Sequence, residues 1–281
     1  MNTAQSQIPT EKLVSLSKAV RISIITMLHE ALNGHAAGAM GMADVFTSLY
    51  FSILKHDPEK PDWNERDYLL LSAGHICPAW YATLAERGYF DKKELLTLRQ
   101  LGSRLQGHPH LNSLPGIENT SGPLGQGLSQ ALGVALSLKL DSQPNRVYCI
   151  LSDGEHQEGQ TWEAYLYAGA HAVNNLTALI DRNHIQIGGP TETILPLDSL
   201  KEKIEAFNWN VIEVDGHSHQ EIIAACATAK QTTSKPTAII CNTTPGKGVS
   251  FMENNYHWHG KFPDDTEMKQ ALAELQTGTH E

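Results

Sequence analysis

The sequence predicts an α/β fold with a doubly wound, mostly parallel sheet and helices on both of its faces. In the second half of the chain, short apolar runs alternate with segments of helical periodicity. The runs are continuously apolar, as in VYCIL at 147–151 and LTALI at 176–180. Continuous apolar runs separated by helices are typical of parallel strands that are buried on both faces.

The expected elements follow one another along the chain. A helix at 10–30, a glycine-containing loop and a helix through Val45, Leu49 and Ile53 precede a strand at 68–71 and a helix at 79–87. A glycine-rich passage at 107–127 leads into a helix at 128–140. Strands are then expected at 147–151, 176–180, 211–214 and 237–241, with helices at 158–173, 197–207 and 221–230. We find neither an internal repeat nor a linker, so we expect one domain over 1–281, loop-rich to about 140 and with an α/β core over about 141–281.

Composition and charge argue against several classes of protein. Hydrophobic residues make up 41% of the chain, yet no run approaches the roughly 20 apolar residues of a membrane helix. Residues 1–13 lack the charged-then-apolar layout of a signal peptide, so we expect a cytoplasmic protein. The four cysteines are far apart and form no CxxC pair, which disfavours a zinc site or a disulfide framework. A net charge of -10 disfavours nucleic-acid binding but allows a local site for a small anion.

Polar residues at the ends of two neighbouring strands predict a site for a divalent cation. SDGE at 152–155 follows the strand at 147–151, and DRN at 181–183 follows the next strand. Ligands bind at the carboxyl edge of a parallel sheet, so Asp153 and Asn183 are expected to converge there. A carboxylate, an amide oxygen and a backbone carbonyl suit Mg²⁺ and can also suit Ca²⁺. Gly154 and the helix after it suit a phosphate group, although the Asp-Gly pair could also be only a turn.

Four histidines that each adjoin a glycine lie in predicted loops. They are His35, His75, His108 and His259. Imidazole can donate a hydrogen bond to a hydroxyl or a phosphate and can carry charge near neutral pH. Their presence in a chain with an anion site therefore favours a sugar-phosphate ligand. For any one of them, a solvated turn residue is the simpler alternative.

Six blocks of the sequence resemble the transketolase family, in family order and at similar spacing. They are NGHAAGAMGMAD (33–44), LSAGHICPAWYATLAERGYF (71–90), QGHPH (106–110), TSGPLGQGLSQALGVAL (120–136), the stretch from Asp153-Gly154 to Asn183, and PGKGVSFMENNYHWHGKFP (245–263). One Asp-Gly pair is weak evidence, whereas six ordered blocks cover most of the chain. The resemblance implies the diphosphate-binding fold of the family and a ketol-transferring enzyme.

The resemblance also implies thiamine diphosphate as the cofactor, with Mg²⁺ or Ca²⁺, and it assigns roles to matching residues. His75 and His259 would flank the diphosphate. His259 would also act in catalysis, together with His35 and His108, which would hold hydroxyls of the donor sugar and of the reaction intermediate. The backbone carbonyl of Ile185 would complete the shell of the metal ion.

The resemblance extends the expected site to the loop under the thiazolium ring, the diphosphate turn and an interface glutamate. These residues are Gly122, Pro123, Leu124, Gly154, Glu155 and Glu158. Glu158 resembles a glutamate that joins a carboxylate network between protein chains and is counted with the catalytic residues. For Leu124 and Ile185, simple core packing is the alternative.

In the family, the glutamate that activates the pyrimidine ring lies in a second domain, and so do the usual phosphate-binding residues. The chain ends soon after WHGKFP at 258–263, where that domain would begin. The resemblance therefore implies a split transketolase whose partner is a C-terminal subunit carrying the pyrimidine-binding domain, in an α2β2 heterotetramer. We expect the chain alone to be inactive.

Three departures from the family pattern concern the substrate more than the cofactor. The residue before the metal aspartate is Ser152 rather than glycine, which removes no ligand. Alanines at 36 and 37 stand where the family has Pro-Gly after the first histidine, and bulkier residues follow His75. An unusual ketose donor or aldose acceptor is therefore an open alternative.

Three competing interpretations remain at this point. The α-subunit of a 2-oxo acid dehydrogenase also has a GDG-type site but does not explain the QGHPH, SAGHICPAW and WHGKFP blocks. A 1-deoxyxylulose-5-phosphate synthase normally carries both domains in one chain. A non-catalytic binding module would not need the intact set of Asp153, Asn183 and histidines.

Overall fold

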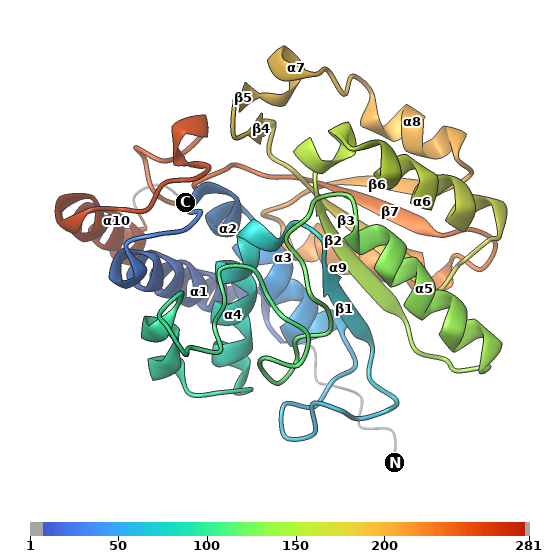
Figure 1. Cartoon of the computed structure of the whole chain (residues 1–281), viewed down its shortest axis with the longest axis horizontal. Coiled ribbons are helices and arrows are strands. Elements are labelled where there is room, and N and C mark those ends of the chain that lie inside the picture. Colours follow the sequence, from blue (N-terminus) through green and yellow to red (C-terminus); the bar gives the residue numbers. More distant parts are fainter. Residues whose placement is uncertain (1–7, 279–281) are drawn as a thin grey trace.

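The computed structural model describes residues 8–278, which form a parallel sheet between two layers of helices (Figure 1). The sheet has five strands in the order β1-β2-β3-β7-β6. They are β1 (Tyr68–Leu71), β2 (Val147–Ser152), β3 (Leu176–Arg182), β6 (Asn210–Asp215) and β7 (Thr237–Asn242). All neighbouring strands run parallel. The predicted fold class is confirmed.

Apolar side chains on alternate positions of each strand enter two separate cores. Tyr148 and Ile150 pack into one core, and Cys149 and Leu151 pack into the other; all four are fully buried. This is why the strands read as continuous apolar runs. Helices α5 (Gly127–Leu140), α6 (Gly159–Ala170) and α8 (Leu200–Ala206) cover one face. Helices α1 (Thr10–Ala31), α3 (Ala43–Ser48), α4 (Cys77–Arg87) and α9 (His219–Gln231) cover the other.

The expected helix through Val45, Leu49 and Ile53 is divided into two pieces, α3 and the π-helical η1 (Leu49–Ile53). The glycine-containing loop expected before it includes a further short helix, α2 (Ala37–Gly41). The helix expected at 197–207 begins only at Leu200, because the Ser199 hydroxyl accepts a hydrogen bond from the Glu202 amide and caps the helix there.

Several short elements were not expected from the sequence. They are β4 (Ile185–Gln186), β5 (Gly189–Pro190), α7 (Thr191–Ile194), α10 (Asp265–Thr277) and four 3-10 turns, η2 (Gly74–Ile76), η3 (Lys92–Thr97), η4 (Gly154–Gln157) and η5 (Tyr256–Trp258). Of these, helix α10 does carry a clear sequence signal, a capping box between Asp264 and Glu267. Residues 98–126 form a long irregular connection across the carboxyl edge of the sheet.

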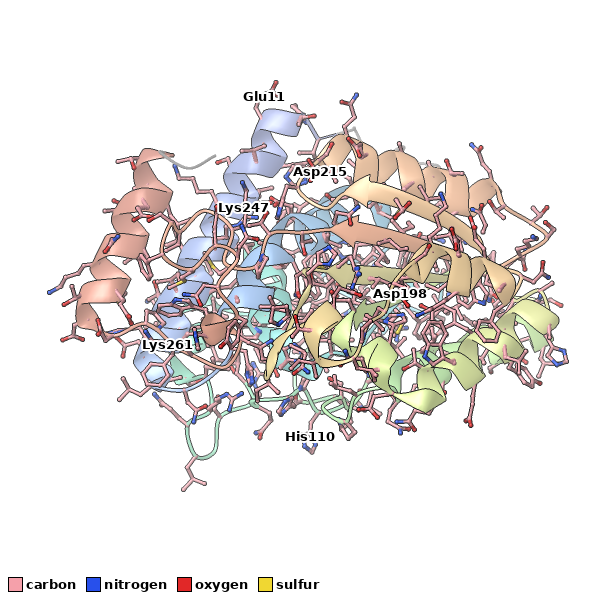
Figure 2. All side chains as sticks on the ribbon, turned by 90° about the horizontal axis from the view of Figure 1, so that it is seen from above. Glu11, His110, Asp198, Asp215, Lys247 and Lys261 are labelled. Atoms are coloured by element: carbon pink, nitrogen blue, oxygen red, sulfur yellow. The ribbon has the colours of Figure 1, made fainter. Side chains whose placement is uncertain are left out.

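The charged side chains of Asp198, Asp215 and Lys261 are exposed on the outside of the molecule, and that of Lys247 is partly exposed (Figure 2). His110, the last residue of the QGHPH block, also points outward and is exposed. Among residues 8–278, no helix has the length and apolar character needed to cross a membrane. Residues 1–7, part of the segment used to argue against a signal peptide, lie outside the described residues.

Candidate active site

The site begins where β2 and β3 end side by side. Ser152 pairs with Asp181 in the parallel register, and the Asp153 amide donates a hydrogen bond to the Asp181 carbonyl at 3.0 Å. The turn after β3 also reaches back to Asp153, because the His184 amide donates to Asp153 Oδ2 at 2.7 Å. The two strand ends therefore place Asp153 beside the 181–184 turn, as the parallel order of the strands requires.

Asp153 is a buried carboxylate with several hydrogen-bond donors around it. Oδ1 accepts from the Gly154 amide at 2.7 Å, and Oδ2 lies 3.2 Å from Arg182 Nη1. Burial raises the pKa of Asp153 to about 6, although Arg182 and the two amides oppose that rise. A buried group that is costly to ionise becomes a strong ligand once a cation compensates its charge.

Asn183 presents its amide oxygen rather than its nitrogen to the cavity side. Its Nδ2 donates to Asp181 Oδ2 at 2.6 Å, while Oδ1 accepts from the Ile185 amide at 3.0 Å. Asp181 is itself held by the Thr243 hydroxyl, and burial raises its pKa to about 8. An amide oxygen has two lone pairs, so Asn183 Oδ1 keeps one for a ligand.

The residues present fit a hard divalent cation with a diphosphate beside it. The Asp153 carboxylate, Asn183 Oδ1 and the Ile185 carbonyl are all oxygen donors. A Cβ added to Gly154 would lie 3.2 Å from Gln186 Cβ, which is a tight contact, and 3.9 Å from the Ile185 carbonyl oxygen, so glycine leaves the most room in this turn. Within residues 8–278, no group of three or more His, Cys, Asp or Glu side chains is placed so that it could hold a metal ion.

The four histidines that the sequence singled out meet around one cavity of about 400 Å³. The ring centroids of His75 and His259 are 4.9 Å apart, and that of His35 lies 5.4 Å from His75, 5.7 Å from His259 and 6.5 Å from His108. The cavity is also lined by Gly154 and by six further residues expected from the sequence or its blocks: Gly122, Leu124, Ser152, Glu158, Asn183 and Ile185. Loops that are distant in the sequence therefore build a single site.

The histidines are held in their neutral form. Burial and the neighbouring His259, Arg99 and His108 lower the pKa of His35 to about 4. Burial also lowers the pKa of His75 well below its usual range, with smaller effects from the other three rings. Neutral imidazoles can donate and accept hydrogen bonds with a sugar hydroxyl, whereas imidazolium rings can only donate.

A loop over 121–125 forms one wall of the cavity and is fixed from below. Gly122 has a φ of 143°, and a Cβ there would meet the His108 ring at 3.4 Å. Glu155 lies behind this wall and is fully buried, accepting from the Ser72 hydroxyl and from the Gly125 amide at 2.6 Å. Burial raises the pKa of Glu155 to about 7. The structure thus places Glu155 under the loop, while Pro123 also lies outside the cavity lining.

Sequence reasoning missed several residues of the site. Gln157, Gln186 and Ile187 line the cavity, and Arg182 touches Asp153. Arg99 joins two histidine loops, because it donates to Asn33 Oδ1 at 3.1 Å and to the Gly107 carbonyl at 3.2 Å. Arg182 could have been found from the sequence, since it directly precedes Asn183 in the DRN strand end. Nothing in the sequence pattern distinguished Arg99 from a surface arginine.

Fold and site together define a class of protein. An open parallel sheet carries, at its carboxyl edge, oxygen donors of the kind that suit a divalent cation, a glycine turn and a histidine-lined cavity. This is the arrangement of an enzyme that binds a phosphorylated cofactor through a divalent cation.

The chain belongs to the transketolase family. Residues 14–280 match the family described as transketolase, thiamine diphosphate binding domain. The chain is 44% identical over 243 residues to the 6-deoxy-6-sulfo-D-fructose transketolase subunit SqwG of Clostridium sp. (strain MSTE9), covering 86% of this chain and 88% of that one. It is 37% identical over 265 residues to one subunit of the apulose-4-phosphate transketolase of Phocaeicola vulgatus, covering 94% of each.

Solved structures give the same result. The transketolase of Campylobacter jejuni superposes with a TM-score of 0.90 at 32% identity, over 96% of this chain and 43% of that one. The chain therefore spans less than half of that transketolase. The expected family, the cofactor thiamine diphosphate and the transferase class are confirmed. The matches favour transketolase over the 2-oxo acid dehydrogenase and deoxyxylulose phosphate synthase alternatives.

Proposed function

We propose that this chain is the diphosphate-binding subunit of a two-subunit transketolase that moves a two-carbon ketol unit from a ketose donor to an aldose acceptor. The observation that carries this proposal is the meeting of His35, His75, His108 and His259 around one cavity beside Asp153. The two curated relatives named above are themselves called transketolase subunits, which supports a division between polypeptides.

Asp153, Asn183 and the Ile185 carbonyl would hold the divalent cation, Mg²⁺ or Ca²⁺, that binds the diphosphate of the cofactor. Gly154 and the N-terminus of α6 would take the diphosphate itself. His75 and His259, which lie closest together, would flank it. Thiamine diphosphate, when bound, supplies the electron sink for cleavage of the carbon–carbon bond.

The remaining residues would orient the sugar and limit access of water. Neutral His35 and His108 would donate to and accept from hydroxyls of the donor, because burial keeps the pKa of each below its usual range. Leu124 and Ile187 would give the cavity apolar walls. Glu158 is exposed at the rim of the cavity, where it would face the partner chain.

We propose that the partner is a transketolase C-terminal subunit with a pyrimidine-binding domain, assembled with this chain as an α2β2 heterotetramer in the cytoplasm. It would bring the activating glutamate and the phosphate-binding residues. The donor would be a ketose with an anionic group at its far end. The relatives' names, which mention a sulfonated fructose and a sugar phosphate, support such a donor.

The test is co-expression with a polypeptide that matches the pyrimidine-binding domain of transketolases. The co-purified complex is assayed for ketol transfer with 6-deoxy-6-sulfo-D-fructose, apulose 4-phosphate and xylulose 5-phosphate as donors. Transfer by the complex and no transfer by this chain alone are expected. Ketol transfer by the purified single chain would contradict the division of labour, and a complex that is inactive with every donor would contradict the activity.

A further inference from the structure

Arg182 lies between two carboxylates, one inside the proposed cation site and one at the surface. Its Nη1 is 3.2 Å from Asp153 Oδ2, and its Nη2 is 2.8 Å from Glu192 Oε1. The Asp153 side chain is 0% exposed, that of Arg182 is 8% exposed and that of Glu192 is 41% exposed. The three side chains therefore form a line of alternating charge from the metal aspartate to solvent.

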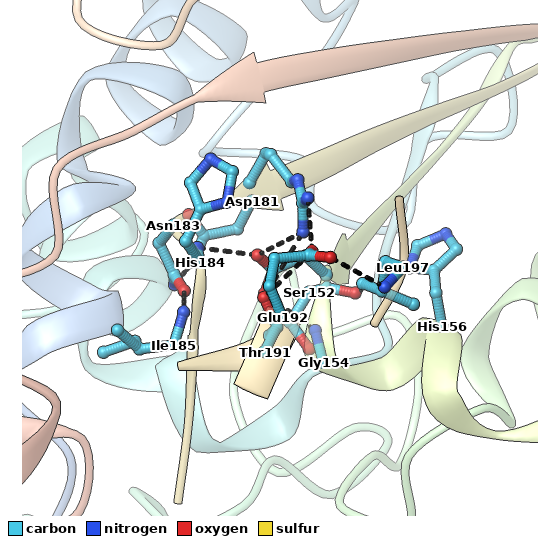
Figure 3. Close-up of polar contacts among 12 residues, drawn as sticks. Ser152, Gly154, His156, Asp181, Asn183, His184, Ile185, Thr191, Glu192 and Leu197 are labelled. Atoms are coloured by element: carbon cyan, nitrogen blue, oxygen red, sulfur yellow. Dashed lines mark hydrogen bonds and ion pairs between the residues drawn. The ribbon is translucent and has the colours of Figure 1, made fainter. Parts of the chain in front are cut away.

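Glu192 also holds a segment of backbone in place. Its Oε2 accepts a hydrogen bond from the Leu197 amide at 3.1 Å (Figure 3). The same oxygen accepts from the Asp198 amide at 3.1 Å. Gln157, three residues after the glycine of the diphosphate turn, donates to the Leu195 carbonyl at 2.7 Å. The segment over 185–198 is thus tied to the cation site twice, through Arg182 and through Gln157.

This segment matters because it begins in the cavity. Its first residues include Ile185, whose carbonyl is a proposed cation ligand, and Gln186 and Ile187, which line the cavity. The segment contains only the two-residue strands β4 and β5 and the short helix α7. Short elements contribute little stability of their own, so the ties at 182, 192 and 157 hold this wall of the cavity.

The guanidinium group and a divalent cation compete for the same carboxylate. Asp153 Oδ2 already accepts a hydrogen bond from the His184 amide. A cation therefore binds Asp153 more strongly when the attraction between Arg182 and Asp153 is weaker. Glu192 offers Arg182 a second anionic partner on the solvent side, and the hydrogen bond from Arg182 lowers the pKa of Glu192, so Glu192 is ionised at neutral pH. Without Glu192, the whole attraction of the guanidinium would fall on Asp153.

We propose that Glu192 is a positioning residue that acts through Arg182. Because Glu192 also binds the Arg182 guanidinium, Asp153 stays available to Mg²⁺. Glu192 thereby couples binding of the cation to ordering of the 185–198 wall. A cation on Asp153 weakens the Arg182–Asp153 contact and thereby strengthens the Arg182–Glu192 contact, which tightens the wall. This inference rests on the proposed function for the identity of the cation site.

The first experiment measures the affinity for Mg²⁺ by titration calorimetry, with Mg²⁺ added to the full chain at saturating thiamine diphosphate. Glu192→Gln is expected to weaken Mg²⁺ binding about tenfold, the loss typical of removing a group that supports a metal ligand. Glu213→Gln is the matched control, because Glu213 is similarly exposed and pairs with the exposed Lys201 at 3.6 Å. Its Mg²⁺ affinity should equal that of the wild type.

A double-variant cycle tests whether Glu192 acts through the arginine. In an Arg182→Met background, and in an Arg182→Lys background in case the first fails to fold, Glu192→Gln should have little further effect on Mg²⁺ affinity. An undiminished tenfold effect in both backgrounds would show that Glu192 acts by its charge alone and would overturn the proposal. Equal affinities for Glu192→Gln and Glu213→Gln would overturn it as well.

Hydrogen exchange read by mass spectrometry tests the wall separately. In the wild type, Mg²⁺ with thiamine diphosphate should slow exchange of the amides over 185–198, and Glu192→Gln should abolish that slowing. In the ligand-free chain, Glu192→Gln should already speed their exchange, because the single oxygen of glutamine cannot accept from Arg182 and from the Leu197 and Asp198 amides at the same time. A wild-type chain that binds no thiamine diphosphate even in complex with its partner would contradict the proposed function, whereas unchanged ligand-free exchange in Glu192→Gln would contradict this inference.

Discussion

The side-chain amide of Asn183 donates a hydrogen bond from Nδ2 to Asp181 Oδ2 at 2.6 Å. Because Asp181 takes the nitrogen, the amide oxygen is the atom left on the cavity side, where a cation needs it. Asp181 is fully buried and is fixed in turn by Thr243, which comes just after β7. The ends of two adjacent strands, β3 and β7, thus determine which atom of Asn183 is left for the site.

The first prediction concerns Asp153, the carboxylate of the proposed cation site. Asp153→Ala should weaken Mg²⁺-dependent binding of thiamine diphosphate about 100-fold, because the diphosphate loses the ion that bridges it to the protein. Calorimetry on the chain with its partner present measures this affinity. Asp265→Ala, at an exposed aspartate of α10, is the control and should leave the affinity unchanged. An unaltered affinity in Asp153→Ala would refute the metal assignment.

His108 is expected to act on the sugar and not on the cofactor. It lies on the loop side of the cavity, and its ring centroid is 6.5 Å from that of His35. His108→Ala should therefore keep the affinity for thiamine diphosphate and slow ketol transfer about 100-fold, the size of effect typical of a lost hydrogen-bonding or acid–base group. Loss of cofactor binding in this variant would mean that the roles of the four histidines are divided differently.

His35 should remain neutral well below neutral pH. Its pKa is lowered to about 4 by burial and by the neighbouring His259, Arg99 and His108. An NMR titration, with the His35 signal assigned by its disappearance in His35→Gln, should give a midpoint near 4. Because the folded form resists protonation, folding stability should fall as the pH drops from about 6.5 towards 4. A midpoint at or above 6.5 would contradict this picture.

The sequence predicted the sheet and most of the site because both depend on local signals. Each strand is a continuous apolar run, and the strand ends at 153 and 183 must meet once the sheet is parallel. The four histidines were found from adjacent glycines and family blocks, and the structure brings their rings to within 6.5 Å of His35. Their roles stay predictions.

What could not be predicted depends on contacts between segments that are distant in the sequence. Arg99 is joined to Asn33, and Glu155 supports Gly125 thirty residues away, and neither pairing leaves a periodic signal. The two-residue strands β4 and β5 were missed because runs this short have no pattern of alternation. In the sequence, Arg182 belongs to the polar end of a strand, and nothing there indicates its contact with Glu192, ten residues later.

The last prediction concerns a buried charge cluster centred on Asp44 of α3. Asp44 is 5% exposed and accepts hydrogen bonds from the two terminal nitrogens, Nη1 and Nη2, of Arg21. It also accepts from His217 Nδ1 at 2.8 Å. His217 Nε2 accepts from the Thr244 amide, so the cluster connects α1 and α3 to the loop after β7. Breaking it should loosen the support of that loop.

Asp44→Asn should lower the free energy of unfolding by about 3–5 kcal/mol at pH 7, because it leaves Arg21 buried without its counter-charge. Burial opposes ionisation of Asp44, but Arg21 and His217 outweigh it and hold its pKa well below the usual range. The stabilisation is therefore present above pH 4 and is lost as the pH falls below it. Urea unfolding from pH 7 to pH 2 should show a smaller acid-induced loss in Asp44→Asn than in the wild type. Asp265→Asn, which removes an exposed partner of His29, is the control and should cost less than about 1 kcal/mol; an equally small cost for Asp44→Asn would mean that the cluster does not support the fold.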